Sequence, residues 1–126
     1  MAEFLMKYKL KKLNLSDKFI VESRATSSEE VGNSIHIGTR KILDKFGIDY
    51  SKKRATKITK EDVLNFDLII GMDSNNIANL KRMFGKNKKF RLLNEKDIAD
   101  PWYTWDFNTT YIEINEGLDN LLKELI

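Results

Sequence analysis

Residues 100–107 place a carboxylate next to a proline and a run of aromatic side chains, a combination that suits a general acid. This stretch contains the only proline and both tryptophans of the chain. Pro101 restricts Asp100 to an extended or turn conformation and fixes the backbone just after that carboxylate. Desolvation by the neighbouring rings would favour the protonated carboxyl group, as a general acid requires. The alternative is a surface turn whose rings fold back onto the core.

Apolar patterns and capping residues divide the rest of the chain into helices and short strands. Gly47 and Gly85 stand where a helix-ending residue with positive φ belongs, and Thr59 stands at an N-cap. The expected helices are residues 1–13, residues 39–46, a short helix after Thr59, one capped by Asp73 or Ser74, and one capped by Asn108. The last helix is expected to bury Tyr111, Ile114, Leu118, Leu121, Leu122 and Leu125. The expected strands are residues 19–23, 67–72 and 90–93.

This alternation of helices and strands predicts an α/β sandwich built on a parallel sheet. The continuous apolar run of residues 67–72 is typical of a strand that is buried on both faces. Ligands of such sheets bind beyond the carboxyl ends of the strands. The loops after Ser23, Met72 and Leu93 should therefore share one edge. Since the third loop leads to Asp100, the topology favours a functional role for that carboxylate.

Length and composition exclude several classes of protein. A chain of 126 residues is expected to form one domain, residues 1–126. It has no cysteine and a single histidine, His36, so disulfides and thiolate or multi-histidine metal sites are not expected. The net charge of +3, from 22 basic and 19 acidic residues, gives little support for nucleic-acid binding. No apolar run is long enough to span a membrane and no signal peptide is visible, so we expect a cytoplasmic protein without membrane contact.

Several motifs, taken in order and with their spacing, resemble the low molecular weight protein tyrosine phosphatases. Asp100-Pro101-Trp102-Tyr103 is similar to the acid loop of that family, which is the most specific of these motifs. The other matching pieces are residues 1–5, 21–26, 47–48, 59–62 and 66–73. The matches run almost from end to end of the chain.

The resemblance implies a phosphotyrosine protein phosphatase I-like fold, a three-layer α/β sandwich with a small central parallel sheet. It assigns to Asp100 the protonation of the leaving phenolate oxygen, and to Trp102 and Tyr103 the walls of the pocket for the phosphotyrosine ring. The implied substrate is a phosphotyrosine protein or a small aryl phosphate, and the implied chemistry needs no metal or other cofactor. Ser23 matches a serine that helps to hold the phosphate loop, although an ordinary serine at a strand end is an equal alternative.

Other positions depart from the family pattern. Glu29 and Glu30 stand where an aromatic residue is common, which leaves the substrate preference open. Lys53 lies near the place where the family often has a histidine, whereas His36 lies elsewhere.

The main departure concerns the family's first strand and the phosphate-binding loop that follows it. That loop carries a nucleophilic cysteine and, after five residues, an arginine, and the first helix follows directly. The present sequence starts at the residues that match this helix, and it contains no cysteine. We therefore expect the 126-residue chain to be inactive, as a truncated form of a phosphatase. The alternatives are a catalytically dead binding module and a relative of arsenate reductase, which shares the fold but uses several cysteines.

The same departure has a consequence for the sheet. In the family the first strand is central, and its neighbours correspond to residues 19–23 and 68–72. Without it, backbone N–H and C=O groups of both segments are left unpaired, at about 1–3 kcal/mol for each buried group. We expect the two segments either to pair with each other or to pair with another copy, so that the chain forms a homo-oligomer through its exposed strands.

Overall fold

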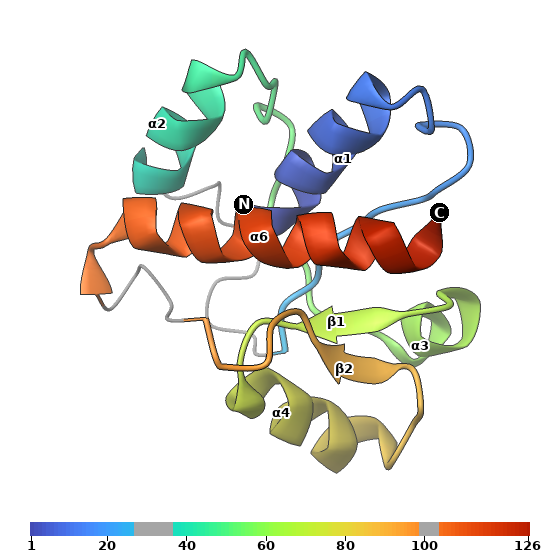
Figure 1. The fold of residues 1–126 in the computed structure, drawn as a ribbon. Helices are drawn as coiled ribbons and strands as arrows, with labels where there is room; N and C mark the ends of the chain where they lie inside the picture. The colour runs from blue at the N-terminus through green and yellow to red at the C-terminus, as the bar shows by residue number, and fades with distance from the viewer. Residues whose placement is uncertain (27–36, 99–103) are drawn as a thin grey trace.

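The computed structural model describes residues 1–26, 37–98 and 104–126, and these form an α/β fold (Figure 1). The elements in chain order are α1 (Ala2–Lys12), α2 (Ile37–Lys45), α3 (Lys60–Asn65), β1 (Ile69–Gly71), α4 (Ser74–Phe84), β2 (Phe90–Leu92) and α6 (Phe107–Leu125). Within these described ranges, no helix is long and apolar enough to cross a membrane.

The two strands form a parallel pair with Ile69 opposite Phe90 and Gly71 opposite Leu92. Helix α4 packs against both strands, while α6 packs against α1 and α2 on the other side of the sheet (Figure 1). The side chains of β1 alternate between these two layers, as a strand requires. Ile70 packs against the core of α1, α2 and α6, whereas Ile69 packs against the smaller core beneath α4. The sheet therefore separates two hydrophobic cores.

Local sequence signals set most helix ends as expected. Thr59 caps α3, accepting from the Asp62 N–H at 3.2 Å while the Asp62 carboxylate accepts from the Thr59 N–H at 3.0 Å. Asp73 caps α4 in the same way with Asn76. Gly47 follows α2 at φ +67° and Gly85 ends α4 at φ +78°, conformations that glycine adopts without steric cost.

The strand expected at residues 19–23 is absent from the structure, which corrects that prediction. Among the described residues, the nearest backbone bridge lies just beyond the segment, where Ala25 forms an isolated parallel bridge with Lys57. Within the described part of the chain, the backbone groups of residues 20–22 make no hydrogen bonds, and β1 pairs with β2 instead. The sequence has the composition of a strand, but no neighbouring strand supplies the ladder. The expectation that residues 19–23 would close up against residues 68–72 is therefore also wrong.

The last helix starts earlier than expected. Its N-cap is Asp106 and not Asn108, because the Asp106 carboxylate accepts hydrogen bonds from the Thr109 N–H at 3.0 Å and the Thr109 hydroxyl at 2.7 Å. Ile114, Leu118, Leu121 and Leu122 are buried as predicted. Tyr111 is half-buried and Leu125 is 38% exposed, so the buried stripe is shorter than predicted at both ends.

Candidate functional site

The carboxyl ends of β1 and β2 lie at one edge of the sheet, and the loops that follow them are joined there. The Asp97 carboxylate accepts hydrogen bonds from the Ser74 N–H at 3.0 Å and the Ser74 hydroxyl at 2.7 Å. The Ile98 N–H donates to the carbonyl oxygen of Met72 at 2.8 Å, just after β1. These bonds place Ile98 at this edge of the sheet. Asp100 follows two residues later in the sequence.

Helix α6 holds the same loop from the other side. The Asn94 amide donates to the backbone carbonyl of Glu113 at 2.9 Å. Gly117 lies so close that a Cβ atom placed there would stand 2.7 Å from Leu93 and would also collide with the Asn94 side chain. Ile98 is 2% exposed and belongs to the main core, together with Leu5 and Leu118. The loop that leads to Asp100 is therefore anchored by buried contacts up to residue 98.

A buried carboxylate lies at the N-terminal end of α1. Glu3 is 6% exposed, and its two oxygens accept from three groups. The Lys7 ammonium lies 2.6 Å from one oxygen, while the Ser23 hydroxyl at 2.6 Å and the Lys53 ammonium at 2.8 Å share the other. Burial alone would raise the pKa of Glu3, but the hydrogen bonds from Lys53, Lys7 and Ser23 outweigh it and lower the pKa to about 2. Glu3 is thus a buried, ionised carboxylate that links α1 to Ser23 and Lys53.

The structure brings together two of the residues that the sequence analysis singled out. Ser23 and Lys53 both meet at Glu3, and Lys53 also reaches the Ser23 carbonyl oxygen at 3.4 Å. Asp100, Trp102 and Tyr103 lie outside the described residues, as do Glu29, Glu30 and His36.

Sequence reasoning missed the role of Glu3. The available signal was its position in the first turn of a helix, four residues before Lys7, where opposite charges face each other. Its partners Ser23 and Lys53 lie far along the chain, and nothing in the local sequence joins them to it.

Metal-binding groups do not gather in the described part of the chain. Among residues 1–26, 37–98 and 104–126, no group of three or more histidine or acidic side chains is placed so that it could hold a metal ion. The polar groups at the carboxyl edge that the structure describes, such as Asp97 and Ser74, are instead hydrogen-bonded to each other.

A model of the family described as low molecular weight phosphotyrosine protein phosphatase matches residues 1–126. The chain belongs to this family. The low molecular weight protein-tyrosine-phosphatase PtpA of Staphylococcus aureus (strain MRSA252) is 35% identical over 133 residues, which cover 100% of this chain and 84% of that protein.

Solved structures of the family share the fold. SP-PTP, the low molecular weight protein tyrosine phosphatase of Streptococcus pyogenes, superimposes with a TM-score of 0.90 at 44% identity, covering 99% of this chain and 83% of that one. YfkJ from Bacillus subtilis gives a TM-score of 0.93 at 31% identity, covering 98% of this chain and 84% of that one. The resemblance read from the motifs and the predicted α/β fold class are thereby confirmed. This phosphatase-family chain accordingly has a small parallel sheet between layers of helices.

Proposed function

We propose that this chain belongs to a phosphatase that hydrolyses phosphomonoesters through a cysteinyl-phosphate intermediate, with Asp100 as the general acid and Trp102 and Tyr103 as the walls of the aryl pocket. The family match over residues 1–126 and the sequence Asp100-Pro101-Trp102-Tyr103 support these roles. The anchoring of Ile98 at the carboxyl edge supports them further, because ligands of parallel sheets bind there. The substrate would be a phosphotyrosine protein or a small aryl phosphate, and no cofactor would be needed.

A second part of the proposal is that the 126-residue polypeptide does not catalyse this reaction by itself. The observation that carries it is the absence of cysteine from the sequence. Phosphoryl transfer through a covalent intermediate requires an activated nucleophile, and a thiolate fills that role in this family. A general acid alone contributes only roughly 10²–10⁴-fold. Asp100 could therefore donate a proton, but no thiolate of this polypeptide could attack phosphorus.

The test is turnover of 4-nitrophenyl phosphate by the purified chain. We expect no release of nitrophenolate above the rate in buffer, and no difference between the chain and Asp100→Asn. Activity that co-purifies with the chain and disappears in Asp100→Asn would contradict the proposal, because it would show an acid-dependent reaction without the thiolate.

The proposal extends to the state of the chain in solution. We infer a single cytoplasmic domain, residues 1–126, that self-associates through unpaired strand edges. In the described residues the backbone N–H and C=O of Ile70 have no hydrogen-bond partner, and neither do those of residues 20–22. Such edges favour pairing with another chain.

A further inference from the structure

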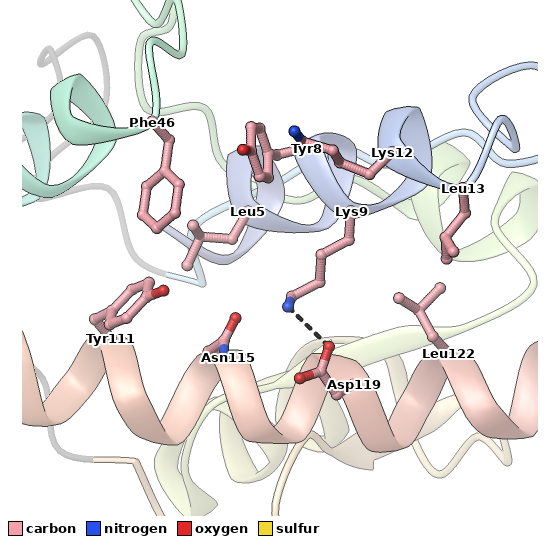
Figure 2. Close-up of a pocket in the computed structure, with 10 residues that line it drawn as sticks. All are labelled: Leu5, Tyr8, Lys9, Lys12, Leu13, Phe46, Tyr111, Asn115, Asp119 and Leu122. Atoms are coloured by element: carbon pink, nitrogen blue, oxygen red, sulfur yellow. Dashed lines mark hydrogen bonds and ion pairs between the residues drawn. The ribbon is translucent and has the colours of Figure 1, made fainter.

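A groove runs between α1 and α6, along the middle and C-terminal turns of α1 (Figure 2). It has a volume of about 430 Å³, within the range of pockets that hold small molecules. Leu5 and Tyr8 line it from α1, Leu13 lines it just after that helix, and Tyr111 and Leu122 line it from α6. The Glu3 network, by contrast, lies at the N-terminal end of α1.

One end of the groove is aromatic. The ring centroids of Tyr8 and Phe46 are 5.3 Å apart, and those of Phe46 and Tyr111 are 5.7 Å apart, so three rings, from α1, from the residue after α2 and from α6, form a continuous row. The other end is aliphatic, where Leu13 faces Leu122 across the gap (Figure 2). Such walls favour a flat apolar ring, because aromatic pairs attract each other beyond the effect of burying apolar area.

Some polar side chains of the groove have a charged or hydrogen-bonding partner among the described residues, and others do not. Lys9 is neutralised by Asp119, whose carboxylate lies 2.8 Å away across the groove (Figure 2). Lys12 has no carboxylate partner among the described residues, and its ammonium instead lies 5.2 Å from the centroid of the Tyr8 ring. The side-chain amide of Asn115 and the hydroxyl of Tyr111 make no hydrogen bond within the part of the chain that the structure describes, and both side chains face the groove (Figure 2).

We propose that this groove binds a flat aromatic anion, an aryl ring that carries a carboxylate or a sulfonate. The ring lies against the row of Tyr8, Phe46 and Tyr111, and the acid group pairs with the Lys12 ammonium. Asn115 and the Tyr111 hydroxyl offer hydrogen bonds to the acid group or to ring substituents. Charge complementarity selects an anion because Asp119 already neutralises Lys9, which leaves Lys12 as the cation without a carboxylate partner among the described residues lining the groove.

The experiment is a titration of the ¹⁵N-labelled chain with 2-naphthoate, followed by amide chemical shifts. We expect saturable shifts at residues of the groove, with contacts between the naphthalene protons and the ring protons of Tyr8, Phe46 and Tyr111. The neutral analogue 2-naphthylmethanol should bind more weakly. No catalytic activity is needed, so the result does not depend on the proposed function.

Two matched variants make the test specific. Lys12→Glu should weaken 2-naphthoate binding about fivefold or more, since it removes an attraction and adds a repulsion. Lys11→Glu changes the net charge equally in the same exposed helical turn, but Lys11 does not line the groove, and binding should change less than twofold. Both variants should melt within a few degrees of the parent chain. Shifts that do not saturate, shifts that map elsewhere, or equal weakening by the two variants would each overturn the proposal.

Discussion

Glu3 in the first turn of α1 accepts a hydrogen bond of 2.6 Å from the hydroxyl of Ser23, although the two residues lie 20 positions apart. Lys53 reaches the same carboxylate from a third segment at 2.8 Å. The segment of residues 19–23 forms no strand, so this bond is one of the few polar links that hold it against the helical layer. The Glu3 carboxylate thus helps to hold residues 19–23 against α1, as pairing with a neighbouring strand would otherwise do.

Glu3→Gln should lower the free energy of unfolding by about 3 kcal/mol, because it removes the buried carboxylate that pairs with the partly buried Lys53 ammonium. Urea unfolding followed by circular dichroism measures the change. Glu124→Gln is the control, since Glu124 pairs with Arg91 on the exposed surface, where solvent screens the pair and its contribution to stability is small. Equal losses in both variants would show that the Glu3 network does not stabilise the fold.

The same group predicts how stability depends on pH. The pKa of Glu3 is lowered from 4.5 to about 2 in the folded chain, so its carboxylate stabilises the fold above pH 4.5. That contribution is lost as the pH falls from 4.5 through about 2. The difference in unfolding free energy between the parent chain and Glu3→Gln should therefore shrink as the pH falls through this acid range. A difference that does not change between about pH 7 and about pH 3 would contradict the assignment.

Self-association through the unpaired edges predicts a dimer or larger species by light scattering after gel filtration. Ile20 is 81% exposed within the unpaired segment, and Ile20→Lys should shift the species toward the monomer, because a charged side chain discourages edge pairing. Ile112→Lys makes the same change at a residue of α6 that is 60% exposed, and it should leave the species unaltered. A parent chain that stays monomeric at all concentrations would show that the unpaired strand edges do not cause self-association.

Local signals in the sequence predicted the elements whose causes are local. Thr59 and Asp73 are N-caps because side chain and backbone satisfy each other within three residues, and β1 follows from its apolar run. Residues 19–23 were mispredicted because a strand depends on a partner that composition does not reveal.

The same limit applies to the candidate site. The motif at Asp100 identified the family, but the contacts that anchor its loop, such as Ile98 to Met72 and Ser74 to Asp97, join segments far apart in sequence. The network around Glu3 could not be read from the sequence for the same reason.

The most direct test of the central claim uses a chimera. The segment that precedes the first helix in the family, with its cysteine and arginine, is taken from the Streptococcus pyogenes phosphatase and joined ahead of Met1. The chimera should hydrolyse 4-nitrophenyl phosphate, and Asp100→Asn should lower its kcat by roughly 10²–10⁴-fold. Asp106→Asn in the same stretch should change kcat little, because asparagine caps a helix as well as aspartate does. A folded chimera that is inactive, or one that Asp100→Asn leaves unchanged, would contradict the account.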